Sequence, residues 1–190
     1  MRTLITNIKE LVQVEYCPKL RAVGKEMARI ETVKDAYLLV EDGFIKDFGP
    51  MGMLAEQTAD RVVDATGRMV FPSFCDSHTH LVYAGSREIE YCDKIRGLSY
   101  EEIAKRGGGI LNSAKRVQEA SEQQLYDDAF LRLEQMIDFG SGAVEIKSGY
   151  GMTVEAEMKM LRVIRRLKET SPLTIKSTLL GAHGIPMEYR

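Results

Sequence analysis

Residues 71–88 read FPSFCDSHTHLVYAGSRE, and this stretch decides the fold class. Its apolar first half predicts a strand that ends in the polar segment DSHTH (76–80). Because residues i and i+2 of a strand point to the same face, His78 and His80 can reach one point together. Neutral imidazoles are common ligands for zinc and iron, so the pair predicts a metal site. The alternative is two polar side chains in a loop after a strand, since short motifs also occur by chance.

Alternating elements follow this segment along the chain. Ser99 with Glu102, and Ser121 with Gln124, form two capping boxes, which mark helix starts. We expect helices from these caps, the second through about residue 139, then a buried strand at 142–148, a helix at 153–170 and a strand at 173–183. Strands that alternate with helices are typical of a parallel sheet with crossover connections. We therefore predict an α/β fold, with the histidine pair at the strand end where barrel and open-sheet enzymes place their sites.

A β-rich region precedes the stretch. AYLLV (36–40) and FIKDFG (44–49) flank Asp42-Gly43, which is the signal of a tight hairpin turn. Residues 61–70 predict two more short extended pieces. We therefore expect two domains, a β-rich one at 1–68 and an α/β one at 69–190.

The composition is that of an ordinary globular protein. Of 190 residues, 44% are hydrophobic and 28% are charged, and the net charge is −2, which gives no sign of a nucleic-acid or membrane-surface partner. No apolar run approaches the ~20 residues that a membrane helix needs. The three cysteines, Cys17, Cys75 and Cys92, form no CxxC pair, so we expect a reducing, cytoplasmic location. We expect Cys75 to lie in the core rather than act as a nucleophile.

Further chemically capable residues follow the ends of the expected strands. His183 could be a third metal ligand, a substrate contact, a proton carrier or a solvent-exposed loop histidine. Arg87 could bind a carboxylate through two parallel hydrogen bonds, although the sequence alone favours a surface ion pair with Glu88 or Glu90. Tyr150 could donate a hydrogen bond to a substrate or cover the core.

Six segments resemble the imidazolonepropionase family of the metal-dependent amidohydrolase superfamily. They lie between about Phe71 and Tyr189 and read FPSFCDSHTHLVYAGSRE, LSYEEIAKRGGGIL, VEIKSGYGM, EMKMLRVIRRL, LLGAHGIP and EYR. The HTH triplet alone marks the superfamily, whereas EIKSGYG together with the GGGIL and LGAH segments marks this family. Ser73 and Cys75 depart from the family pattern, which usually has a glycine and an apolar residue there.

The resemblance implies a hydrolase that opens the ring of 4-imidazolone-5-propanoate to N-formimino-L-glutamate in histidine degradation. It implies one zinc or iron ion per subunit, a small-molecule substrate, no nucleic-acid or membrane partner, and a homodimer. The positions that match the first two metal ligands are His78 and His80. The positions that match substrate-binding residues are Arg87, Tyr150 and His183, with Tyr100 lining the same pocket. The alternative is another cyclic amidohydrolase or a deaminase of the same superfamily.

The expected strands are too few for the fold that the resemblance implies. A (β/α)8 barrel has eight strands and typically about 250 residues. The sequence therefore predicts a partial (β/α)8 TIM barrel, its first three strands, preceded by part of a small composite β-sandwich. In the family, the remaining metal-binding histidine and the catalytic aspartate come from later strands. We expect them in a C-terminal half and expect residues 1–190 alone to be inactive; a truncated, non-catalytic product is the alternative.

Overall fold

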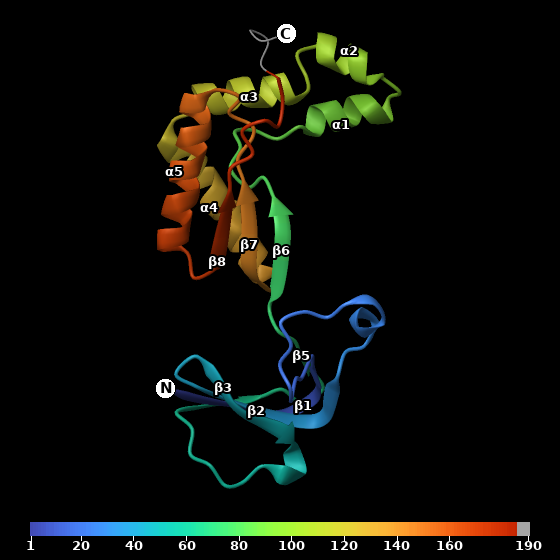
Figure 1. Cartoon of the computed structure of the whole chain (residues 1–190), viewed down its shortest axis with the longest axis vertical. Coiled ribbons are helices and arrows are strands. Elements are labelled where there is room, and N and C mark those ends of the chain that lie inside the picture. The colour runs from blue at the N-terminus through green and yellow to red at the C-terminus, as the bar shows by residue number, and fades with distance from the viewer. Residues whose placement is uncertain (186–190) are drawn as a thin grey trace. The chain divides into compact units, whose positions relative to one another are not determined.

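The chain forms two compact units, Met1–Pro72 and Ser73–Arg190 (Figure 1). The computed structural model describes residues 1–185 and, for Ala104, the backbone alone. The EYR segment of the family resemblance lies outside the described residues. None of the helices within 1–185 has the length and apolar character needed to cross a membrane.

The first unit is a five-stranded sheet. Its strands are β1 (Arg2–Val12), β2 (Thr32–Glu41), β3 (Phe44–Pro50), β4 (Arg61–Asp64) and β5 (Met69–Val70). The order is β3-β2-β1-β4, and β5 also pairs with β1. β2 is antiparallel to both of its neighbours, whereas β4 and β5 run parallel to β1. Short 3-10 helices, η1 (Gly24–Ala28) and η2 (Met51–Met53), lie in the connections.

The predicted hairpin in this unit is confirmed. Asp42 (φ 51°) and Gly43 (φ 84°) connect β2 and β3 with the two positive φ angles that an Asp-Gly turn supplies. Residues 61–70 also form two short strands as predicted, β4 and β5. Tight turns and short alternating segments depend on neighbouring residues alone, which is why these elements could be predicted.

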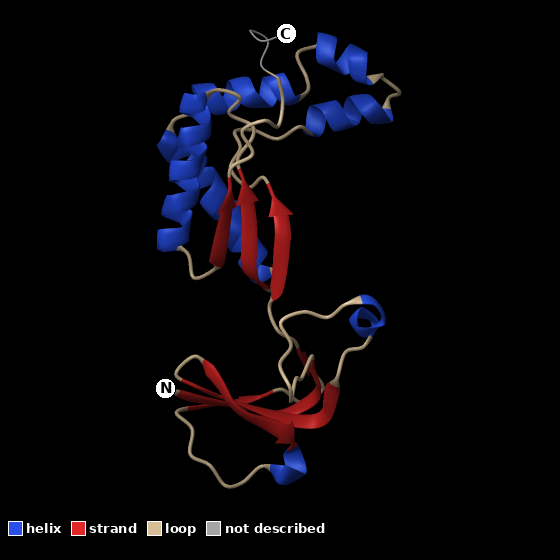
Figure 2. Ribbon diagram, in the orientation of Figure 1, coloured by secondary structure: helices blue, strands red, loops and turns tan. Residues whose placement is uncertain are grey.

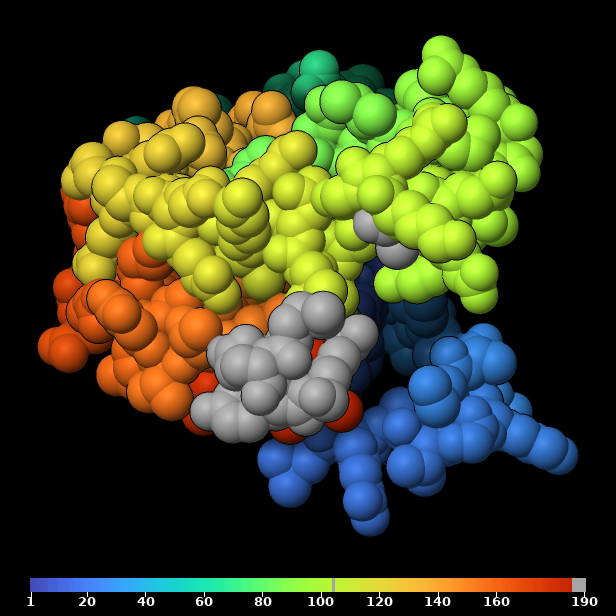
Figure 3. Space-filling model, turned by 90° about the horizontal axis from the view of Figure 1, so that it is seen from above, coloured from blue at the N-terminus to red at the C-terminus, as the bar shows by residue number. Residues whose placement is uncertain are grey.

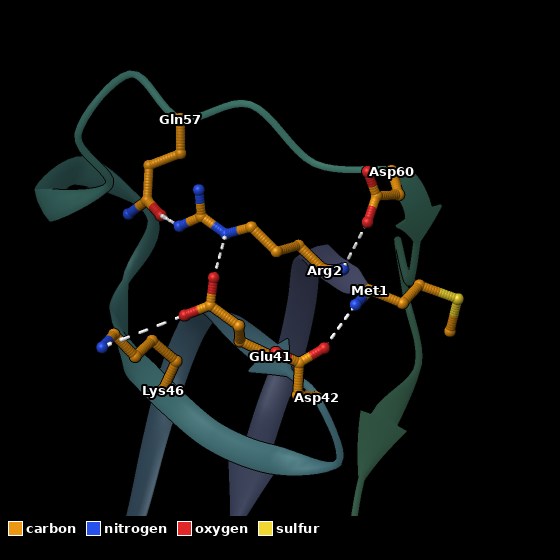
Figure 4. A network of polar contacts seen from close by, with 7 residues as sticks. All are labelled: Met1, Arg2, Glu41, Asp42, Lys46, Gln57 and Asp60. Atoms are coloured by element: carbon orange, nitrogen blue, oxygen red, sulfur yellow. Dashed lines mark hydrogen bonds and ion pairs between the residues drawn. The ribbon is translucent and has the colours of Figure 1, made fainter.

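A polar network joins separate parts of the first sheet (Figure 4). The Met1 ammonium contacts the Asp42 carboxylate at 2.5 Å. The Arg2 backbone N–H donates to Asp60 at 2.6 Å, and Arg2 Nε lies 3.1 Å from Glu41. The network therefore links the start of β1 to the β2–β3 hairpin and to the segment just before β4. Because most of its members are exposed or half-buried, each contact adds little to stability.

The second unit is a parallel sheet with helices. β6 (Phe74–Thr79), β7 (Ser141–Lys147) and β8 (Thr174–Thr178) lie side by side in that order and run parallel (Figures 1 and 2). The helices are α1 (Glu88–Ile95), α2 (Tyr100–Lys105), α3 (Ile110–Glu119), α4 (Glu122–Asp138) and α5 (Val154–Thr170). The predicted alternation of strands and helices is confirmed. The strand predicted at 173–183 is wrong beyond Thr178, because the chain turns there and leaves the sheet.

The core of the second unit lies between the sheet and its two long helices. α4 contacts β7 and α5 contacts β8, and Figure 1 shows both helices along one side of the sheet. Fully buried side chains of this core include Leu125, Leu133, Ile146, Ile164, Leu167 and Ile175. Cys75 is exposed, so its prediction as a core residue is wrong. Among the described residues, β6 is one edge of this sheet, and the long helices pack against β7 and β8 instead, which leaves Cys75 uncovered.

Capping side chains explain which helices could be predicted. The Ser99 backbone N–H donates to the Glu102 carboxylate at 2.8 Å, and the Glu102 N–H donates back to Ser99 Oγ at 3.3 Å. Ser121 Oγ accepts from the Gln124 N–H at 3.1 Å at the start of α4. The capping box at Ser99 is confirmed; at Ser121 the cap is present, but within residues 1–185 the Gln124 side chain makes no return contact to the Ser121 N–H. α1 and α3, which the sequence did not predict, begin without a side-chain cap.

Candidate functional site

Four rings converge at the carboxyl ends of the three parallel strands. His78 lies in β6, His80 follows it directly, Tyr150 follows β7 and His183 follows β8. The ring centroid of His80 lies 5.7 Å from that of His78, 4.8 Å from that of Tyr150 and 4.9 Å from that of His183. The His80 and His183 rings are stacked at an interplanar angle of 5°. The structure thus brings these four sequence-predicted residues together.

The imidazole of His80 has one nitrogen without a partner. Its Nδ1 is buried and makes no hydrogen bond within the described residues. Burial lowers the pKa of His80, and electrostatic interactions with the neighbouring His183 and His78 lower it further. The lowered pKa favours the neutral ring, which keeps a lone pair for a metal ion or a hydrogen-bond donor.

The donor set of this site fits a metal ion in part. His78 and His80 offer two imidazoles from one strand end, and the unpartnered Nδ1 of His80 shows that its ring has a free donor atom. Within residues 1–185, no group of three or more His, Cys, Asp or Glu side chains is placed to hold an ion. Catalytic zinc usually takes three protein ligands. The described residues therefore supply two of the ligands that such a centre needs.

A cavity of about 270 Å³ opens beside the rings. The residues that line it are His80, Tyr83, Gly85, Ser86, Arg87, Ser113 and Tyr150. The connection after β6 supplies most of this lining, and α3 adds one residue. Figure 3 looks onto this end of the unit and shows α2 and α3, in lime to yellow, at its surface. The cavity is near the size of a small-molecule site and includes two predicted substrate-binding residues.

Arg87 lines the cavity and is paired with Glu90. Arg87 Nε donates to Glu90 Oε2 at 2.8 Å, and its Nη2 contacts the same oxygen. Glu90 Oε1 accepts from the Gly109 backbone N–H at 2.9 Å. The hydrogen bond from Arg87 lowers the pKa of Glu90 and raises that of Arg87 itself. The ion pair that the sequence favoured is therefore present, with Glu90 rather than Glu88, and it holds the guanidinium at the cavity wall.

Tyr100 lies apart from the cavity lining. It is the first residue of α2, and its side chain is 63% exposed. Its role in the pocket therefore stays a prediction. Lys147, in the strand before Tyr150, contacts the Glu145 carboxylate at 2.5 Å, so its charge is already paired.

Two carboxylates near the site are missed by sequence reasoning. Glu90 accepts from the Gly109 backbone, and Glu157 accepts from the backbone of the connection after β7. Backbone N–H groups are present at almost every residue, so these contacts leave no side-chain pattern that the sequence could reveal. Tyr83 and Ser113 join the cavity for a similar reason, because only the fold places a loop and α3 beside it.

Structural comparison shows which solved proteins share the fold. E. coli guanine deaminase matches with a TM-score of 0.62 at 14% identity, over 93% of this chain and 36% of that chain. Triazine hydrolase from Arthrobacter aurescens gives 0.52 at 13% identity, over 94% and 35%. Atrazine chlorohydrolase of Arthrobacter aurescens TC1, complexed with zinc, gives 0.52 at 14%, over 93% and 35%. These neighbours belong to the amidohydrolase superfamily, and at such identities the likeness shows the fold alone.

Sequence comparison finds curated relatives that match along the whole chain. The curated imidazolonepropionase of Christiangramia forsetii is 56% identical over 190 residues, which are 100% of this chain and 46% of that protein. That of Flavobacterium johnsoniae is 55% identical with the same coverage, and that of Clostridium tetani is 42% identical over 96% of this chain and 45% of its own. No family model matches. The chain spans about half the length of the curated relatives it matches, and the predicted resemblance to the N-terminal part of imidazolonepropionases is confirmed.

Proposed function

We propose that the whole protein hydrolyses 4-imidazolone-5-propanoate to N-formimino-L-glutamate. The observation that carries this proposal is identity of up to 56% to curated imidazolonepropionases along the whole chain. The convergence of His78, His80, Tyr150 and His183 at one sheet end supports it, because a hydrolase needs its polar groups together. Hydrolysis adds water across the ring C–N bond, and the protein's task is to hold the ring and the developing charge in place.

His78 and His80 would hold the metal ion, zinc or iron. This role is supported by their shared strand end, by the lowered pKa of His80, which favours its neutral ring, and by the unpartnered Nδ1 of His80. When bound, the ion supplies Lewis acidity that lowers the pKa of a water and stabilises negative charge on a carbonyl oxygen. The zinc reported for the structural neighbour atrazine chlorohydrolase supports metal use in this fold class. Imidazole ligands suit both zinc and iron.

The substrate carboxylate would bind Arg87 at the wall of the cavity. A guanidinium presents two parallel N–H groups to a carboxylate, but in the free protein Glu90 already accepts from Arg87. Substrate binding therefore uses the remaining N–H groups of Arg87 or displaces Glu90. The Tyr150 hydroxyl donates a hydrogen bond to the ring of the substrate, and His183 contacts the same ring from the end of β8. Tyr100, at the start of α2 and outside the cavity lining of the free protein, would join the pocket when substrate is bound.

The two units would be parts of the two domains that we expect in the whole protein. The parallel order β6-β7-β8 supports a role as the first three strands of a (β/α)8 barrel, within the domain expected at 69–190. The sheet of the first unit supports a role as part of the β-sandwich expected at 1–68. We expect the catalytic residues on later strands of the whole protein, which we take to be a cytoplasmic homodimer.

Turnover by the purified whole protein tests this proposal. 4-Imidazolone-5-propanoate is compared with other cyclic amides and with an aminopurine, and products are identified by mass. The proposal expects N-formimino-L-glutamate and the highest kcat/KM for imidazolone propanoate. A higher kcat/KM for another ring, or release of ammonia from the purine, would overturn the assignment of the substrate.

A further inference from the structure

Glu157 is a buried acid that the proposed reaction does not use. It lies in the first turn of α5, and only 6% of its surface is exposed. Glutamate is almost never this buried unless its charge is balanced. Among residues 1–185 no lysine, arginine or histidine forms an ion pair with Glu157. Its carboxylate must therefore be stabilised in another way.

Three backbone N–H groups surround the Glu157 carboxylate. Oε2 accepts from Gly149 at 2.8 Å, and Oε1 accepts from Gly151 at 2.7 Å and from Met152 at 3.1 Å. All three donors belong to the connection between β7 and α5. The positive end of the α5 dipole, at the helix N-terminus, further favours the negative charge. The carboxylate therefore acts as a buried anchor for this connection, residues 148–152.

The anchored connection carries Tyr150 between its three donors. The Tyr150 ring lies 4.8 Å from the His80 ring and 5.1 Å from the His183 ring, centroid to centroid. The carbonyl of Gly149 also lies 3.2 Å from His183 Nδ1. Movement of the backbone here would therefore displace Tyr150 and the contact to His183 together.

The backbone of this connection also needs an external anchor. Met152 has φ 56°, a left-handed conformation that a methionine adopts only when its surroundings enforce it. Gly151 packs so tightly against α5 that a Cβ there would lie 2.5 Å from the Glu157 backbone nitrogen. Close packing and strained backbone together indicate one fixed arrangement rather than a mobile loop. The hydrogen bond from Gln118 Nε2 to the Gly151 carbonyl, 2.8 Å, adds a second attachment from α3.

We propose that Glu157 is a positioning residue, whose buried carboxylate holds residues 148–152 so that Tyr150 faces the histidines and the substrate. This inference rests on the proposed function for the identity of the substrate, and on the contacts above for the anchoring itself. Glu157 touches no reacting atom and acts only through the connection that it holds.

The experiment compares Glu157→Gln with the matched control Glu155→Gln in the whole protein. Glu155 lies exposed in the same turn of α5, and its substitution removes the same charge. Glutamine keeps the volume of Glu157, but an NH2 group replaces one of its two accepting oxygens, so at least one backbone N–H loses its acceptor. Amide hydrogen exchange of residues 148–152 is measured by mass spectrometry, and KM and kcat are measured with imidazolone propanoate. Glu157→Asp, which keeps the carboxylate on a shorter side chain, is the second variant.

The proposal expects about ten- to hundredfold faster exchange at residues 148–152 in Glu157→Gln, since hydrogen bonds to a charged group are lost. Exchange in the Glu155→Gln control should not change, and Glu157→Asp should recover part of the protection. KM should rise about tenfold with little change in kcat. In a Tyr150→Ala background, Glu157→Gln should change KM less than about twofold, because the ring that it positions is gone.

Unchanged exchange in Glu157→Gln would overturn the anchoring. An equal KM effect with and without Tyr150 would overturn the positioning and leave a merely structural role. Absence of wild-type turnover would refute the proposed function, and the exchange result would then decide the inference by itself. The two failures are therefore distinguishable.

Discussion

Gly149 allows the His183 ring to approach the connection after β7, and Gly149→Ala should remove this approach. Gly149 has φ +114°, and a Cβ there would lie 2.9 Å from His183 Nδ1 and 3.1 Å from its Cγ. Forcing an L-residue into positive φ costs about 1–2 kcal/mol. Displacing the ring also loses the 3.2 Å contact between His183 Nδ1 and the Gly149 carbonyl, worth about 0.5–1.5 kcal/mol. We therefore expect a total loss of about 1.5–3.5 kcal/mol in the free energy of unfolding.

A matched variant separates backbone strain from displacement of the ring. Gly97 has φ +91°, and nothing lies within 4 Å of a Cβ there, so Gly97→Ala introduces the strain alone. Urea unfolding of the whole protein should show a loss of about 1–2 kcal/mol for Gly97→Ala and about 1 kcal/mol more for Gly149→Ala. Only Gly149→Ala should raise KM for imidazolone propanoate. Equal stability losses and equal KM values in the two variants would refute the reasoning.

Three further variants test other parts of the structure. Arg87→Ala should raise KM with kcat nearly unchanged, because it loses a charge-assisted contact to the substrate carboxylate, worth ~1.5–3 kcal/mol of binding free energy. Steady-state kinetics measures this, and an unchanged KM would contradict the carboxylate contact. The pKa of Glu90 is lowered from 4.5 by Arg87 and, to a smaller extent, by the Gly109 N–H. The stability that these contacts supply is therefore present above pH 4.5 and is lost as the pH falls through the lower pKa of the folded state. Urea unfolding across that pH range should show that the free energy of unfolding depends less on pH in Glu90→Gln than in the wild type. An equal pH dependence in the two proteins would contradict this role of Glu90. Leu133→Ala, at a fully buried position, should lower the free energy of unfolding by about 2–5 kcal/mol, whereas Leu131→Ala, at an exposed position, should change it by less than about 0.5 kcal/mol. Thermal unfolding compares the two variants, and similar losses would contradict the assigned core.

Elements set by neighbouring residues could be predicted from the sequence. The Asp42-Gly43 turn and the caps at Ser99 and Ser121 depend on side chains within three residues of the backbone they bind. The alternation of strands and helices after residue 73 also follows from local apolar patterns. These local rules were enough to give the parallel sheet and the strand end that carries His78.

Features that depend on distant neighbours could not be predicted. Cys75 has a core-like position in its strand, but β6 is one edge of the described sheet and the long helices pack against β7 and β8 instead, which leaves it exposed. His80 and His183 are far apart in sequence, and only the parallel register of the strands stacks their rings. Glu90 and Glu157 accept hydrogen bonds from backbone N–H groups. Almost any residue can supply such a group, so no sequence motif predicts their roles.

The most direct test of the account concerns the histidine pair after the apolar strand. The double variant His78→Ala/His80→Ala is made in the whole protein, and bound zinc and iron are measured by elemental analysis beside turnover of 4-imidazolone-5-propanoate. We expect the wild type to contain one of these metals and to form N-formimino-L-glutamate, and the double variant to have neither metal nor activity. A double variant with full metal content and normal turnover would contradict the assignment of these two residues as metal ligands.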